Sequence, residues 1–243
     1  MTMTPKPSSS YLVETLNWSA HIYRISFKRV FIAAFVTALL NQLLGLYFIN
    51  TFSFSEGSIN VSMPIGLGIS LFLMLFVMLF GNSLILVWQN SCLRNESLSL
   101  AAAFKRVLQR FPGILLSGII FAFLGLIGIA LYILPGLIFM TFFCIYLPSL
   151  LFAHKKAFES WMFSFNLVKR HFFSSLGIVL INLILLWIPP ELMEILSNII
   201  NVDGSLYGLE ITVIVIVIAF ILPMTNALIL AWFYKLQEVS KLP

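Results

Sequence analysis

Long stretches without a charged side chain alternate along this chain with short segments that collect its charges. Asp, Glu, Lys and Arg are absent from residues 30–55, 57–93, 111–154, 171–190 and 211–234. A helix needs about 20 apolar residues to cross about 30 Å of hydrocarbon. The first, second, fourth and fifth stretches therefore predict one membrane-spanning helix each, over residues 30–49, 66–88, 172–189 and 210–233.

The third stretch, residues 111–154, is long enough for two crossings. It contains Pro135-Gly136, a pair that favours a tight turn because proline fixes φ and glycine accepts conformations that other residues resist. We therefore predict two further spans, over residues 113–133 and 136–153. A re-entrant hairpin that enters and leaves on one side is the alternative for this stretch.

The basic residues provide an independent check on a count of six spans. With six spans, both termini and the loops 89–112 and 154–171 lie on one side, and that side receives all fourteen lysines and arginines. The opposite side receives only acids, Glu56, Glu191, Glu194, Asp203 and Glu210. Because Lys and Arg in short loops are retained in the cytoplasm, both termini are predicted to be cytoplasmic.

Composition excludes a water-soluble protein. Hydrophobic residues make up 60% of the chain, charged residues 9%, and the mean hydropathy is +1.04, whereas soluble domains are about 25% charged. The predicted fold is all-α, a polytopic transmembrane helical bundle of six spans with amphipathic cytoplasmic interfacial helices. One membrane domain covers residues 22–236, between a disordered N-terminal tail at 1–21 and a short C-terminal tail at 237–243.

The bases gather in amphipathic segments that precede the spans. The segment that contains "FKRVLQRF" has an apolar face at helical spacing, formed by Leu100, Phe104, Val107, Leu108 and Phe111. Ser97 or Ser99 is expected to cap this helix. Similar segments are "HKKAFESWMFSFNLVKRHFF" and "IYRISFKRVF". Their bases are candidate contacts for anionic lipid headgroups or a partner protein: Lys105, Arg106, Arg110, Lys155, Lys156, Lys169 and Arg170.

These bases have two possible roles. They could contact headgroups or a partner protein, or they could serve only to orient the chain in the membrane. Nucleic acid is not an expected partner, because the charge is spread along one membrane face. The interior of the predicted spans contains no acidic or basic side chain, which argues against an ion-coupled carrier. Their amides are expected to form interhelical hydrogen bonds, the candidates being Asn41, Asn82, Asn182 and Asn226.

Enzymatic chemistry finds no support in the sequence. It contains no nucleophile elbow, phosphate-binding loop, HExxH or dinucleotide motif. His21, His154 and His171 lack the spacing of metal ligands. We therefore predict no catalytic residues, no metal site and no cofactor, and a protein that is not an enzyme.

The run "LPGLIFMTFFCIYLPSLLFAHKKAFESWMFSFNLVKRHF" at 134–172 resembles the central signature of the YciC-like family of uncharacterised bacterial inner-membrane proteins. The matching positions are Pro135, Gly136, Pro148, Ser160, Leu167 and Lys169. A similar pattern occurs in the membrane domains of some glycerophosphodiester phosphodiesterases. The resemblance implies a six-span protein of the bacterial inner (plasma) membrane and supplies no catalytic residues.

The expected function is a non-enzymatic membrane component that organises lipids or a partner protein at the cytoplasmic leaflet. One alternative is a facilitator or channel for a small neutral or amphipathic solute, with the four asparagines along its path. The other is a membrane accessory of a lipid-modifying enzyme.

Overall fold

The chain folds into long helices arranged as hairpins. The computed structural model describes residues 8–52, 62–131, 133–153, 155–200 and 207–240. In order, its helices are α1 (Ser8–Phe52), α2 (Ser62–Leu93), α3 (Leu100–Leu131), α4 (Ile133–Phe143), α5 (Tyr146–Phe152), α6 (Ala157–Val168), the short 3₁₀ helix η1 (Lys169–His171), α7 (Phe172–Ile200) and α8 (Tyr207–Ser240). No strand occurs in these ranges.

Six helical segments are long and apolar enough to cross a membrane, which confirms the predicted bundle of six spans. They are Tyr11–Phe48, Gly68–Leu93, Leu100–Gly128, Ile133–Phe152, Ala157–Leu196 and Ile211–Ser240. Helices are the expected form, because backbone N–H and C=O groups find no water partners in hydrocarbon and must pair within the segment. The protein is therefore a multi-pass membrane protein.

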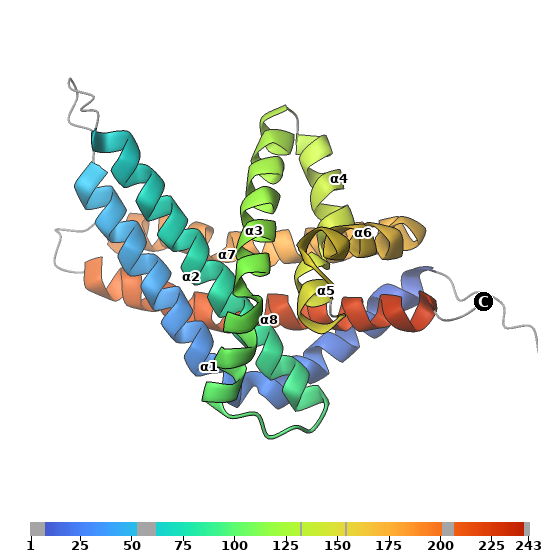
Figure 1. Ribbon diagram of the computed structural model, residues 1–243. Helices are drawn as coiled ribbons and strands as arrows, with labels where there is room; N and C mark the ends of the chain where they lie inside the picture. The colour runs from blue at the N-terminus through green and yellow to red at the C-terminus, as the bar shows by residue number, and fades with distance from the viewer. Residues whose placement is uncertain (1–7, 53–61, 132, 154, 201–206, 241–243) are drawn as a thin grey trace, which may run out of the picture.

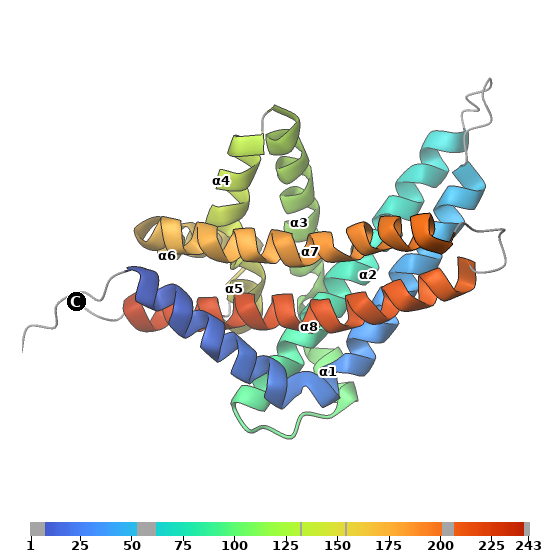
Figure 2. The same ribbon diagram turned by 180° about the vertical axis from the view of Figure 1, so that it is seen from behind.

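The spans pair as three hairpins, α1 with α2, α3 with α4, and α7 with α8, and the far end of the α3–α4 hairpin stands apart from the other two (Figures 1 and 2). Helix α8 is the central element: 61% of its span is buried within the protein, against 28–39% for the others. Trp232 and Phe233 of α8 are among the largest fully buried side chains. The other helices therefore leave most of their apolar surface for lipid.

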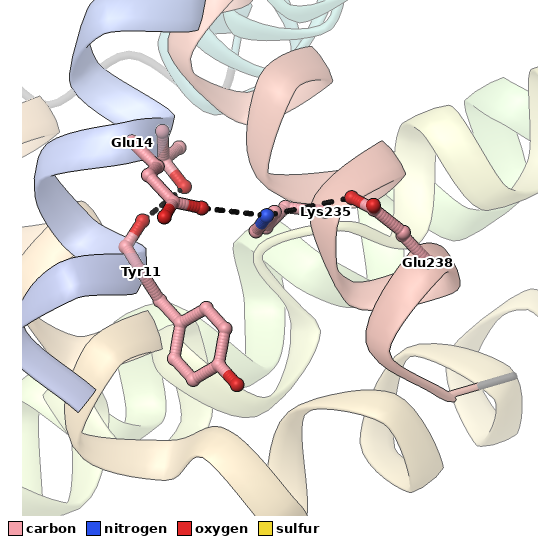
Figure 3. A network of polar contacts seen from close by, with 5 residues as sticks. Tyr11, Glu14, Lys235 and Glu238 are labelled. Carbon is pink, nitrogen blue, oxygen red and sulfur yellow. Dashed lines mark hydrogen bonds and ion pairs between the residues drawn. The ribbon is translucent and has the colours of Figure 1, made fainter. Parts of the chain in front are cut away.

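Helix α1 is bent, so that its first part runs along α8 and its second part pairs with α2 (Figure 2). An ion-pair network joins the start of α1 to the end of α8 (Figure 3). Lys235 Nζ lies 2.7 Å from Glu14 Oε2 and 3.4 Å from Glu238 Oε2. The same ammonium lies 5.7 Å from the ring centroid of Tyr11. These contacts attach the N-terminal part of α1 to the bundle.

The N-terminal prediction needs correction as a result. Residues 1–21 were expected to form a disordered tail, but α1 begins at Ser8, and residues 1–7 lie outside the described ranges. The physical reason is tertiary, because this segment packs on α7 and α8: Tyr11, Leu12 and Leu16 contact the buried cluster that includes Trp232 and Phe233. At the other end, α8 continues to Ser240, past the predicted boundary at 236.

The turn between the third and fourth spans also differs from the prediction. Pro135-Gly136 does not form the turn, because α3 ends at Leu131 and α4 already begins at Ile133. Pro135 lies in the first turn of α4, where a missing N–H costs no hydrogen bond. Gly136 is buried, and a Cβ added at Gly128 of α3 would lie 2.8 Å from its Cα. The glycines therefore allow close packing within the hairpin.

Only one of the three expected interfacial helices is a separate element. This is α6, which begins after Lys156 and leads through η1 into α7. Residues 22–31 lie within α1, and "FKRVLQRF" is the first part of α3. The predicted fifth span likewise extends, because α7 continues through Pro189 and Pro190 to Ile200.

The predicted apolar face of "FKRVLQRF" is divided in the structure. Val107 and Phe111 are buried, together with Ala103 and Ile114, while the side chains of Leu100, Phe104 and Leu108 are 46–60% exposed. This start of α3 packs against α2 and α5, so its buried face is rotated relative to the expected one. The rotation brings Arg110 and Arg106 toward a cavity within the protein.

Candidate functional site

The candidate site lies where α2 turns back into α3. Helix α2 ends with Arg94 N donating to Asn90 O at 3.1 Å and Glu96 N donating to Ser91 O at 2.9 Å. Asn95 takes the left-handed conformation with φ of 53°, in which Asn is tolerated at helix ends. Of the two predicted caps for α3, Ser99 is the one used, because its Oγ accepts from Ala102 N at 3.2 Å. The tight turn therefore holds Arg94 and Glu96 beside the first turns of α3.

A cavity of about 420 Å³ opens beside this turn. Three arginines from separate positions meet there, together with one carboxylate and two amides. We define the arginine pocket by its lining residues, Val87, Asn90, Arg94, Glu96, Arg106, Gln109, Arg110, Leu151 and Phe152. Its charged groups sum to +2, from three guanidinium groups and one carboxylate.

One of the three arginines is hydrogen-bonded to a neighbouring helix. Arg110 Nη1 donates to the backbone oxygen of Leu150 in α5. The Tyr234 hydroxyl of α8 donates to Asn90 Oδ1 in α2. A hydrogen bond with the same hydroxyl raises the pKa of Arg94 above its ordinary value, with a smaller contribution from Glu96. Guanidinium groups are not deprotonated in proteins, so the three arginines keep their charges throughout the physiological pH range.

Arg106 is held more loosely. Its Nη1 lies 3.5 Å from Glu96 Oε2, and both side chains are about half exposed, at 55% and 41%. Charge-assisted hydrogen bonds between guanidinium and carboxylate groups are shorter, about 2.7–2.9 Å. Glu96 therefore leaves most of the donor capacity of Arg106 unused, since a guanidinium carries five N–H groups.

The structure brings together some of the predicted basic contacts and separates others. Arg106 and Arg110 share the pocket, whereas Lys105 is exposed and lies outside its lining. Arg94 was not among the predicted contacts, although it completes the group. The sequence feature that could have identified Arg94 is its position directly after α2, because a tight turn to α3 places this residue near Arg106 and Arg110.

The remaining predicted bases lie around α6 and η1. Lys155 Nζ lies 5.9 Å from the ring centroid of Phe163, and Lys156 N donates to Glu159 Oε2 at 3.4 Å at the start of α6. Lys169 Nζ donates to Asn166 Oδ1 at 3.0 Å. Lys169 and Arg170 line a second cavity, of about 320 Å³, with His171 and the end of α8. Its lining contains one guanidinium, that of Arg170, against three in the arginine pocket.

The four predicted asparagines have different environments. Asn226 Nδ2 donates to Asn82 Oδ1 at 2.8 Å and so links α8 to α2. Asn41 Nδ2 donates to Thr37 O of its own helix at 3.1 Å. Asn182 Nδ2 is buried without a hydrogen-bond partner. Gln89 was not among the predicted contacts, but it also links α2 to α8, because its Nε2 donates to Pro223 O at 2.7 Å.

Groups suited to metal binding are absent from the part of the chain that the structure describes, since no three His, Cys, Asp or Glu side chains gather there. Cys92 and Cys144 are free thiols. Of the two acids on "ELMEILSNII", Glu191 accepts a hydrogen bond from Trp187 Nε1 on its own helix. The arrangement best suited to a ligand is therefore the arginine pocket, which favours an anion.

Fold and pocket together define a class, the multi-pass α-helical membrane protein with an arginine-lined cavity at a helix turn. Comparison with known proteins adds nothing to this class, because no protein-family model, curated protein or solved structure matches the chain. The resemblance to the YciC-like family therefore stays a prediction.

Proposed function

We propose that this protein is a non-enzymatic component of the bacterial inner membrane that binds and organises anionic phospholipids at the cytoplasmic leaflet, with both termini in the cytoplasm. The observation that carries the proposal is the arginine pocket, where Arg94, Arg106 and Arg110 meet and, together with Glu96, give a net charge of +2. Guanidinium groups bind phosphate oxygens in pairs of parallel hydrogen bonds.

The position of the pocket supports a lipid ligand. It lies at an end of α2 and α3 that carries Arg94, Lys105 and Arg106, where headgroups of a bilayer would be. Each base near an anionic leaflet adds about 1 kcal/mol of attraction. Val87, Leu151 and Phe152 give the same cavity an apolar wall, which suits the glycerol and acyl part of a lipid.

A solute path along the four asparagines has weaker support. Asn82 and Asn226 are bonded to each other, and Asn41 to its own helix. Side chains that satisfy one another offer a solute fewer hydrogen bonds than free ones would. We therefore prefer lipid binding over a facilitator or channel.

Lipid analysis of the protein extracted in patches of its own membrane tests the proposal. Mass spectrometry would compare lipids retained by the wild type with those retained by the double variant Arg94→Gln/Arg106→Gln. The matched control is Lys105→Gln/Lys156→Gln, which removes two charges from exposed positions outside the pocket.

We expect the wild type and the control to retain anionic phospholipid and the pocket variant to lose most of it. Equal retention by all three proteins would contradict the proposal and would leave the bases with the single role of orienting the chain. Equal loss in both variants would also contradict it, because diffuse surface charge would then account for the binding.

A further inference from the structure

The charge balance of the arginine pocket indicates more than a general preference for anions. Its three guanidinium groups and the Glu96 carboxylate leave a charge of +2. A phosphomonoester carries a charge of about −1.5 to −2 at pH 7, because its second pKa is about 6. A phosphodiester, the form in most phospholipid headgroups, carries only −1. The monoester is therefore the better match for the pocket.

Hydrogen-bond capacity favours the same ligand. Arg110 is positioned by its hydrogen bond to Leu150 O, so ordering its side chain on binding costs little. The Oδ1 of buried Asn90 already accepts the Tyr234 hydroxyl, so its Nδ2 remains as a donor for the pocket. A terminal phosphate offers three oxygens to these donors, whereas a bridging phosphate in a diester offers two.

Glu96 has a distinct place in this arrangement. Its carboxylate is the one anion in the lining of the pocket, and it lies 3.5 Å from Arg106. It thus partly occupies the position that a phosphate oxygen would take. The contact is long, and both side chains are about half exposed. A dianionic phosphate can therefore displace the Glu96 carboxylate from Arg106, whereas a monoanion attracts Arg106 less strongly.

We propose that the arginine pocket is a selective site for a phosphomonoester group, such as the headgroup of phosphatidic acid or a free phosphate, with Glu96 as an internal competitor for Arg106. This inference rests on the proposed function and makes it specific. Two sources share the chemistry, a lipid whose chains lie along Leu151 and Phe152, or a soluble phosphate.

Binding of short-chain lipids to the full-length protein in detergent tests the inference. The probes are dioctanoyl phosphatidic acid and, as a diester with identical chains, dioctanoyl phosphatidylglycerol. We expect phosphatidic acid to bind about 10-fold more tightly, since loss of one charged hydrogen bond corresponds to roughly that factor. Arg106→Gln should remove this preference, whereas Lys105→Gln, one residue away on an exposed position, should retain it.

Glu96→Gln provides a test that misfolding cannot imitate. Removal of the competing carboxylate should raise the affinity for phosphatidic acid about 3- to 10-fold, and loss of structure would lower it. Competition with inorganic phosphate then identifies the source. Displacement of phosphatidic acid by phosphate would support a site for the phosphate group alone, and resistance to it would support a site for the whole lipid.

The inference would be overturned by equal affinity for the two lipids, or by unchanged or weaker binding of phosphatidic acid in Glu96→Gln. If both lipids bind equally and both are lost in Arg106→Gln, the monoester inference fails while the proposed function stands. If neither lipid binds the wild type, both proposals fail together.

Discussion

Individual polar side chains hold α8 in the centre of the bundle. Asn226 Nδ2 donates both to Asn82 Oδ1 and to Leu222 O, each at 2.8 Å. Gln89 adds its bond to Pro223 O, while its own Oε1 is buried without a partner. In hydrocarbon an interhelical hydrogen bond contributes about 0.6–2 kcal/mol. These amides therefore determine how α2 and α8 align more than how strongly they associate.

Asn226→Leu tests this alignment. We expect a loss of about 1–2 kcal/mol in the free energy of unfolding, because Asn82 would lose its donor within the bundle. Thermal unfolding in detergent measures the change.

Asn41→Leu is the matched control, because Asn41 donates only to Thr37 O on its own helix, and it should change stability by less than about 0.5 kcal/mol. An equal loss in the two variants would show that the Asn82–Asn226 pair does not connect the helices.

Of the four asparagines expected to link helices, Asn82 and Asn226 bond to each other, whereas Asn41 bonds to its own helix and Asn182 Nδ2 has no hydrogen-bond partner. Asn82 and Asn226 are 144 positions apart, and nothing in local spacing indicates that they meet. Gln89 was missed because it lies near the end of a span, where a polar side chain is ordinary. Arg94 was missed because it meets Arg106 and Arg110 only through the tight turn that joins α2 to α3.

At the scale of elements, close helix contacts depend on glycines. A Cβ added to Gly81 of α2 would lie 2.8 Å from the Cβ of Thr37 in α1. Thr37 is buried, and its hydroxyl is already bonded to Ala33 O at 2.7 Å. The side chain therefore has little freedom to move away.

Gly81→Ala is accordingly expected to destabilise the protein by about 1–3 kcal/mol, the usual cost of overpacking. Thermal unfolding of the purified protein measures it. Gly68→Ala in the same helix is the control, because nothing lies within 4 Å of a Cβ there, and it should leave stability unchanged or raise it by up to about 1 kcal/mol. A stable Gly81→Ala variant would show that the contact between α1 and α2 is looser than the structure indicates.

Local sequence predicted the location of the spans better than it predicted the boundaries of the helices. Charge-free stretches located six spans, but Ser8–Phe52 is one helix where a disordered tail and a shorter span were expected. Helices continued through residues 22–31 and 100–112 because neighbouring helices bury one face of each. Prolines were poor guides to boundaries, since α7 contains Pro189 and Pro190.

At the scale of the whole molecule, the arrangement makes a prediction about sidedness. Asn95 in the turn after α2 and Ile133 at the start of α4 are both exposed, at opposite ends of α3. We expect a membrane-impermeant maleimide applied to intact bacterial spheroplasts to label Ile133→Cys and not Asn95→Cys, in a background with Cys92 and Cys144 replaced.

Permeabilised cells provide the control, because both cysteines should then react. Labelling of Asn95→Cys from outside would reverse the proposed orientation. If Ile133→Cys stays unlabelled from outside while both sites react after permeabilisation, the stretch 111–154 is a re-entrant hairpin and not two crossings.

The sequence by itself determined the class of protein, the number of spans and the segregation of bases, because these depend on length, hydropathy and charge along the chain. Tertiary structure alone decided which bases meet. Arg94, Arg106 and Arg110 form one pocket because a tight turn joins α2 to α3 and because Leu150 O of α5 accepts a hydrogen bond from Arg110. Lys105 has the same charge and lies beside Arg106 in the chain, yet the rotation of α3 leaves it outside. A binding site needs groups that converge in space, and helical packing sets that convergence.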